Sequence, residues 1–166
     1  MPELITKFAI IRRIMAIKRK LVAVGPATIA STGGLSMPKH VIGEPLVING
    51  RRLSLSRAVR AGDMIYLTGQ VPMQNGQVMT NGTIEEQTRA VLDEITATLS
   101  LVGCTRSDVV KAMVWLKDRA DFPDFNAVYA EYFPEDPPAR SALVSDFLVD
   151  IRVEVEVIAY KPEDRT

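Results

Sequence analysis

The residue types that most often carry enzyme chemistry are scarce in this sequence, which has one cysteine, Cys104, and one histidine, His40, in 166 residues. A single cysteine excludes an internal disulfide, so an oxidising compartment gives the fold no advantage and we expect a cytoplasmic protein. One histidine and one cysteine do not make a usual zinc site or a convincing Ser-His-Asp triad. Any catalysis is therefore expected to use arginine, glutamate, hydroxyl groups and the backbone.

A glycine-rich phosphate-binding motif is missing as well, and the formal net charge is zero. The charge is spread unevenly, because residues 1–36 hold six Lys or Arg and one acidic residue, whereas residues 37–166 hold 14 basic and 19 acidic residues. A mildly acidic body argues against nucleic acid as the main partner.

Residues 1–36 differ from the rest of the chain. Apolar and basic residues alternate there at roughly helical spacing, and no apolar run reaches the roughly 20 residues that cross a bilayer. Three interpretations stay open: a basic amphipathic helix at a membrane or partner surface, a transit-type presequence, or a non-native, disordered extension from an upstream start codon. We treat residues 1–36 as a basic extension and residues 37–166 as one domain, without membrane contact, that is long enough to bury a core.

The first half of residues 37–166 predicts strands followed by a helix. Loose alternation over 51–60, a Gly-Asp turn at 61–63 and β-forming residues over 64–70 predict a hairpin, and a short third strand is expected near Val78. Thr83 and Glu86 form a capping-box pattern, followed by apolar residues spaced three, four or seven apart up to Val102, so a helix is expected that Gly103 ends.

The second half predicts a strand, a helix and two more strands. Residues 109–118 are almost continuously apolar, which indicates a strand covered on both faces. Asp121 is the expected cap of a helix with an aromatic face, which Pro134 ends. A double proline then precedes Arg140 and an apolar run, and strict alternation over 151–157 is typical of a half-buried strand.

The resulting order, β-β-β-α-β-α-β-β, predicts an α+β fold in which both helices pack on one face of a mixed sheet. The opposite face would carry Met113 and Trp115, which are too apolar to face water in a monomer. Burial against other subunits is the simplest explanation.

Six segments then indicate a family. AGDMIYLTGQVP, the Glu86-Gln87-Thr88 helix, DVVKAMVWLKD, FNAVYAEYF, PPARS and VEVEVIAY occur in the order and spacing typical of the reactive intermediate deaminase (Rid) family, which the chain resembles from about Arg57 to Pro162. The resemblance implies a chorismate-mutase-like fold and a homotrimer with a barrel-like centre, outer helices and ligand clefts between subunits. It also implies hydrolysis of enamines and imines such as 2-aminoacrylate and 2-iminopropanoate to the 2-oxo acid and ammonia, without a cofactor.

The resemblance also implies roles for individual residues. The family's carboxylate-binding arginine falls on Arg140, which suits the chemistry because a guanidinium offers a planar fork to a carboxylate. The glutamate that holds the attacking water falls on Glu154, the hydroxyl of the second strand on Thr68, and the asparagine of the second helix on Asn126.

Two positions depart from the family pattern. Ala142 replaces a frequent cysteine whose implied role is carried by its backbone, which alanine also supplies. Leu55 replaces a tyrosine that often lines the cleft, and this change bears on substrate preference more than on reaction class.

Less specific interpretations remain. Arg140 could be an ordinary surface or ion-pair residue with Glu154 as its partner, and Arg152 and Glu156, which share the face of Glu154, could neutralise it. The same clefts could also hold a small carboxylate without turnover in a trimeric binding, chaperone or regulatory protein.

Overall fold

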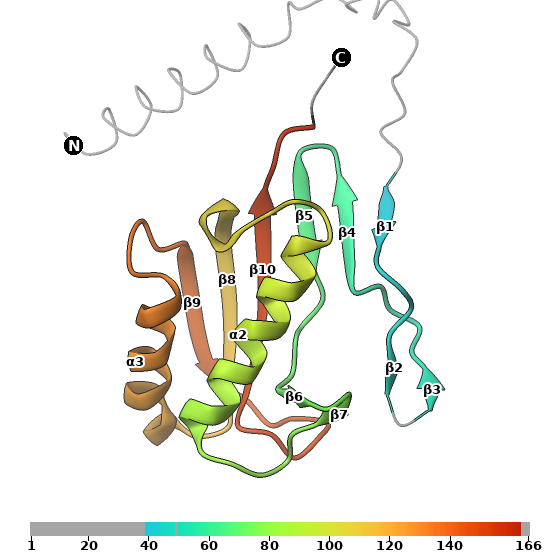
Figure 1. The fold of residues 1–166 in the computed structure, drawn as a ribbon. Coiled ribbons are helices and arrows are strands. Elements are labelled where there is room, and N and C mark those ends of the chain that lie inside the picture. The colour runs from blue at the N-terminus through green and yellow to red at the C-terminus, as the bar shows by residue number, and fades with distance from the viewer. Residues whose placement is uncertain (1–38, 49, 164–166) are drawn as a thin grey trace, which may run out of the picture. The chain divides into compact units, whose positions relative to one another are not determined.

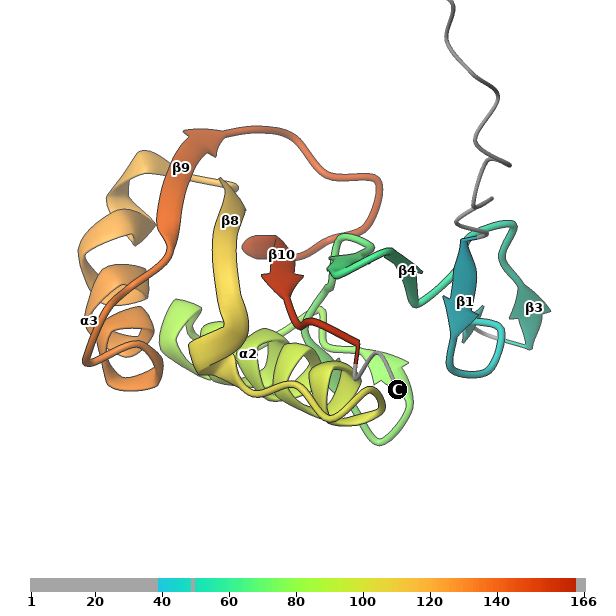
Figure 2. The ribbon, with the colours of Figure 1, turned by 90° about the horizontal axis from the view of Figure 1, so that it is seen from above.

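The computed structural model describes residues 39–48 and 50–163. One six-stranded sheet dominates these residues, and helices α2 and α3 cover one of its faces (Figures 1 and 2). All neighbouring strands are antiparallel except β8 and β9, which are parallel, so the predicted α+β fold with a mixed sheet is confirmed. In spatial order the strands are β1 (His40–Ile42), β4 (Ala58–Ala61), β5 (Met64–Leu67), β10 (Val153–Tyr160), β8 (Val109–Leu116) and β9 (Ala139–Val144).

The first strands differ from the prediction. The expected strand over 51–60 is interrupted: residues 51–52 form β3, which pairs with β2 in a small hairpin, and only 58–61 join the main sheet. The strand near Val78 lies in a second small hairpin, and the main sheet is extended beside β4 by the edge strand β1 instead. Strand β1 has three residues, of which only Ile42 is buried, so no alternation marks it. The hairpin strands are β2 (Val47–Ile48), β3 (Arg51–Arg52), β6 (Met73–Gln74) and β7 (Gln77–Val78).

Helix α2 (Ile84–Ser100) begins and ends as its sequence predicts. The Thr83 hydroxyl accepts from the Glu86 N–H and the Glu86 carboxylate accepts from the Thr83 N–H, which completes the capping box. After the helix, Gly103 adopts φ 67°, its N–H donates to the Ser100 carbonyl, and the Cys104 N–H donates to the Leu99 carbonyl. These two bonds are the glycine-based ending that the sequence indicated.

Within one chain, the helices cover only one face of strand β8, so the chain itself does not supply the second cover expected for residues 109–118. Ala112, Val114 and Leu116 are buried under the helices, whereas Met113 and Trp115 alternate with them and are only half-buried. The near-continuous apolar character of β8 therefore does not reflect two helix layers in one chain. Its second face forms the open face of the sheet, by which we mean the face that α2 and α3 do not cover.

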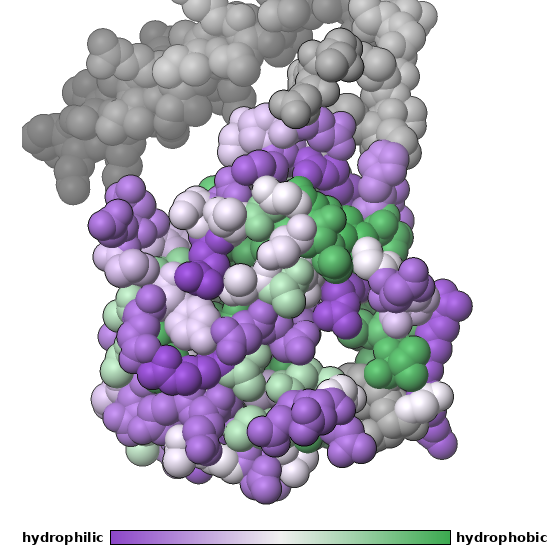
Figure 3. Space-filling model, in the orientation of Figure 1, coloured by the Kyte–Doolittle hydropathy of each residue, from purple (hydrophilic) through white to green (hydrophobic). Residues whose placement is uncertain are grey.

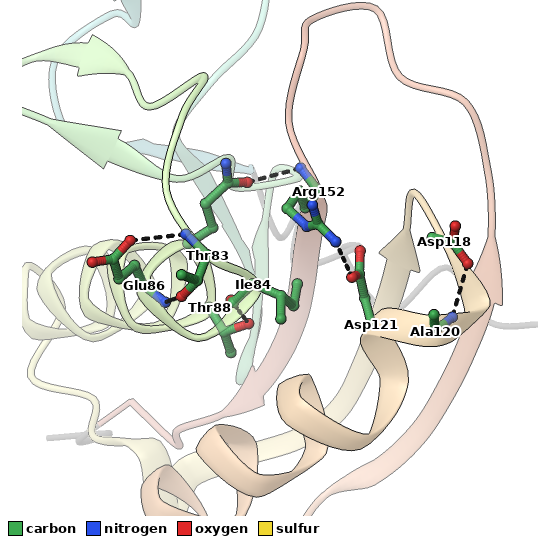
Figure 4. A network of polar contacts seen from close by, with 9 residues as sticks. Thr83, Ile84, Glu86, Thr88, Asp118, Ala120, Asp121 and Arg152 are labelled. Carbon is green, nitrogen blue, oxygen red and sulfur yellow. Dashed lines mark hydrogen bonds and ion pairs between the residues drawn. The ribbon is translucent and has the colours of Figure 1, made fainter.

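Asp121 does not cap helix α3 (Phe122–Tyr132) as predicted. Its buried carboxylate instead pairs with the Arg152 guanidinium, while the Arg152 N–H donates to the Gln87 side-chain oxygen at 2.8 Å (Figure 4). The adjacent Asp118 accepts from the Ala120 N–H at the start of the short 3-10 helix Arg119–Asp121. This network fixes the starts of α2, α3 and β10 relative to one another.

The helical side of the molecule presents mainly hydrophilic residues over α3 and the lower half of α2 (Figure 3). Within the described residues, none of the helices is both long and apolar enough to cross a membrane. The predictions for residues 1–36 concern a segment outside the described residues.

Candidate functional site

Strand register places Arg140 and Glu154 on opposite faces of the sheet. Arg140 pairs with Ala112, which is buried beneath the helices, whereas Glu154 pairs with Trp115 on the open face. Directly paired residues project to the same side of a sheet. One chain therefore does not bring the guanidinium and the carboxylate together, and the interpretation that they form an ion pair within one chain is wrong.

The Arg140 guanidinium is held by side chains of helix α3. Its Nη2 donates to the Asn126 Oδ1 at 2.7 Å. Its central carbon lies 4.4 Å from the centre of the Tyr129 ring, 5.5 Å from that of Phe125 and 5.9 Å from that of Phe122. Arginine is attracted to aromatic faces at these distances, so the fork has a defined position before any ligand binds.

These contacts leave the positive charge of Arg140 without an anion. The ion pairs of the described residues do not include Arg140, and its hydrogen-bond acceptor is a neutral amide. Burial raises the pKa of Tyr129 to about 12, so the ring below the guanidinium stays a neutral phenol. A half-buried, ordered and unpaired guanidinium is suited to bind a carboxylate.

Glu154 lies half-buried on the open face. Burial, and next the charge of Glu156, raise the pKa of its carboxyl above the usual range. Arg152 does not neutralise it, because that guanidinium pairs with Asp121. A carboxylate with a raised pKa can hold and deprotonate a water molecule more readily than an ordinary one.

Gly69 leaves the space that the Glu154 carboxylate occupies. A Cβ atom on Gly69 would lie 2.0 Å from the Glu154 Oε1. Gly69 is not among the residues with positive φ, so backbone conformation does not demand glycine here. Its lack of a side chain thus serves the placement of Glu154.

We expect Gly69→Ala to displace the Glu154 carboxylate. If Glu154 holds the attacking water, as the family resemblance implies, kcat for imine hydrolysis should fall on the order of 100-fold, as misplacement of a reacting group by about 1 Å can cause. The fold should persist, because alanine suits this backbone. Steady-state kinetics of Gly69→Ala in the wild-type and Glu154→Ala backgrounds test this prediction. Equal losses in both backgrounds would contradict it, since the effect must vanish when Glu154 is absent.

The other predicted site residues are distributed over the sheet. Asn126 contacts Arg140, as described, and Ala142 is exposed two residues further along the edge strand β9. Thr68 directly follows β5 and precedes Gly69, and its N–H donates to the Arg57 carbonyl. Leu55, 43% exposed, lies between β3 and β4, by the other edge of the sheet. One chain therefore does not bring these six residues together.

Two features around these residues are not evident from the sequence. The sequence predicts an aromatic face on α3 but does not show that Phe125 and Tyr129 of this face hold Arg140. The sequence signal for Gly69 is weak: it is a glycine two positions after a strand that no turn requires. Within the described residues, no group of three His, Cys, Asp or Glu side chains is arranged to hold a metal ion.

Comparison with known proteins finds a matching family and several relatives of this chain. Residues 51–161 match the family model described as Endoribonuclease L-PSP. A RutC family protein of Pyrococcus horikoshii is 45% identical over 109 residues, which cover 64% of this chain and 86% of that protein. The 3-aminoacrylate deaminase RutC of Acinetobacter baylyi is 38% identical over 105 residues, covering 62% of this chain and 83% of the relative.

The fold also matches a solved structure. The crystal structure of yeast Mmf1 superposes with a TM-score of 0.68 at 28% identity, covering 75% of this chain and 99% of that one. The Saccharomyces cerevisiae protein MMF1 is named as mitochondrial, which is a statement about that relative. The cytoplasmic location expected for this chain stays a prediction.

Proposed function

Since this chain belongs to the YjgF/RutC/Rid family, which includes deaminases such as RutC, we propose that it hydrolyses 2-imino acids and their enamine tautomers to 2-oxo acids and ammonia. The observation that carries the proposal is the Arg140 guanidinium, which α3 holds in place and which has no acidic partner among the described residues. A 2-imino acid supplies the carboxylate that this group lacks.

The reaction needs only water and side chains. Arg140 binds the substrate carboxylate and thereby orients the neighbouring imine carbon. Glu154 takes a proton from a water molecule whose oxygen adds to that carbon, while the C=N electrons move to nitrogen, which takes up the proton that Glu154 received. The hydroxyl group of the resulting carbinolamine then passes its proton through Glu154 to the nitrogen as the C–N bond breaks, so that ammonia leaves and the 2-oxo acid remains. Imines already hydrolyse in water, so positioning and modest electrostatic help are sufficient.

We place the reaction in a cleft between copies of the chain, in a homotrimer. Arg140 lies on the edge strand β9, Leu55 near the opposite edge, and Glu154 on the open face, so contact between copies is needed to unite them. Exposed apolar side chains support such contact: Tyr66 on β5 is 44% exposed, and Leu143 and Val144 on β9 are 44% and 53% exposed. In a closed ring each copy offers β9 to one neighbour and its open face to the other.

A coupled assay tests the proposed function. An amino-acid oxidase or threonine dehydratase generates 2-imino acids, and semicarbazide traps those that escape hydrolysis. We expect the wild-type protein to suppress trapping of at least one imine. If the protein binds carboxylates but never surpasses buffer with any imine, the second candidate, a trimeric binding or regulatory protein, replaces the first; the loss of the cleft tyrosine at Leu55 is the observation that favours it.

A further inference from the structure

A cavity of about 340 Å³ opens beside Glu154 on the open face. Most of its lining is apolar and comes from three parts of the chain: Val71 after β5, Trp115 in β8, and the loop residues Phe147, Leu148 and Val149 that connect β9 to β10. Its volume lies in the range of small-molecule pockets. Neither the reaction nor the sequence resemblance assigns it a ligand.

We propose that this cavity binds the side chain of the substrate, so that the enzyme acts preferentially on 2-imino acids with bulky apolar side chains. The inference rests on the proposed function. The side chain of a 2-imino acid is bonded to the same carbon that the water attacks. Because Glu154 holds that water and also lines the cavity, the substituent must lie at or next to the cavity when the carbon is in place.

The charges around the cavity sharpen this choice. Its lining includes the carboxylates of Asp146 and Glu154, and no lysine or arginine is among the described residues that line it. A second carboxylate on the substrate would meet like charge there without a partner. Arg140 binds one carboxylate, so a monocarboxylic imine fits the cleft between copies of the chain and a dicarboxylic imine does not.

The experiment compares imines made by amino-acid oxidases from leucine, phenylalanine, alanine and glutamate. We expect kcat/KM for the leucine- and phenylalanine-derived imines to exceed that for the alanine-derived imine at least tenfold, as the extra methylene groups find an apolar pocket. The glutamate-derived imine should be the poorest substrate. Val149→Lys places a cation in the cavity lining. It should therefore raise kcat/KM for the glutamate-derived imine above that for the leucine- and phenylalanine-derived imines.

Val110→Lys is the matched control, because Val110 is 45% exposed against 42% for Val149 and does not line the cavity. It should leave the substrate order unchanged. An active wild-type enzyme that favours the alanine- or glutamate-derived imine would overturn the inference while the proposed function stands. The inference is also overturned if the wild-type enzyme shows no preference among side chains and Val149→Lys fails to assemble, as measured by light scattering. The cavity would then be a contact surface for a second copy of the chain. No turnover of any imine would remove the proposed function itself.

Discussion

Replacing Arg140 with alanine is expected to lower kcat/KM for imine hydrolysis on the order of 100- to 1,000-fold, the loss that accompanies removal of one member of a desolvated, hydrogen-bonded charge pair. Most of the loss should be in KM, because the guanidinium binds the carboxylate in the ground state and the transition state alike. The semicarbazide-coupled assay, run over a range of imine concentrations, measures both parameters. An unchanged kcat/KM would remove Arg140 from the site.

Two further variants separate binding from packing. Arg140→Lys keeps a charge but loses the planar fork and should recover only part of the affinity. Arg106 offers a matched control, since its guanidinium also lies over an aromatic ring, 5.2 Å from the centre of Tyr132, and donates to the Tyr132 carbonyl. Arg106→Ala should reduce stability without altering kinetics, which shows that loss of a stacked arginine alone is not enough.

Replacing Glu154 with glutamine is expected to lower kcat on the order of 100-fold or more, the usual contribution of a positioned general base, with little change in KM. The same variant should be more stable than the wild type at pH 7. Burial and Glu156 raise the pKa of Glu154 in the folded protein, so folding favours the protonated carboxyl. Stability is therefore full below the ordinary carboxyl pKa and falls as the pH rises through the folded-state pKa.

Thermal unfolding at pH 7 and at acidic pH, together with pH–rate profiles, tests both statements. The stabilisation by Glu154→Gln should shrink towards acidic pH, where the wild-type carboxyl is already neutral. Glu156→Gln, which removes the neighbouring like charge, should shift the acidic limb of the wild-type rate profile to lower pH while the base remains. A wild-type profile without an acidic limb would contradict the role of Glu154 as a base.

Local features of the fold could be predicted from sequence because short-range chemistry determines them. The capping box of Thr83 and Glu86, the ending at Gly103 and the alternation in β10 each depend on residues a few positions apart, and the structure contains all three. Asp121 shows the limit of this reasoning: its local pattern indicates a cap, but Arg152, remote in sequence, offers a stronger partner in a buried position.

The placement of Arg140 and Glu154 on opposite faces could not be predicted, because it depends on strand order and register. Strands β9 and β10 follow each other in sequence, yet β10 lies inside the sheet between β5 and β8, while β9 lies at the edge beyond β8. The sequence alone allows an ion pair between Arg140 and Glu154. The register places them on opposite faces of the sheet. Met113 and Trp115, whose apolar character the sequence marks as unusual, lie on the same open face as Glu154.

Subunit complementation tests the composite cleft most directly. Arg140→Ala and Glu154→Gln chains are refolded together in equal amounts and assayed for imine hydrolysis beside each variant refolded alone. If Arg140 of one copy works with Glu154 of its neighbour in a closed ring, random mixing restores both residues in roughly a quarter of the clefts, and the mixture should recover about that share of wild-type activity. A mixture no more active than its parents, although it assembles like the wild type, would contradict a site shared between copies.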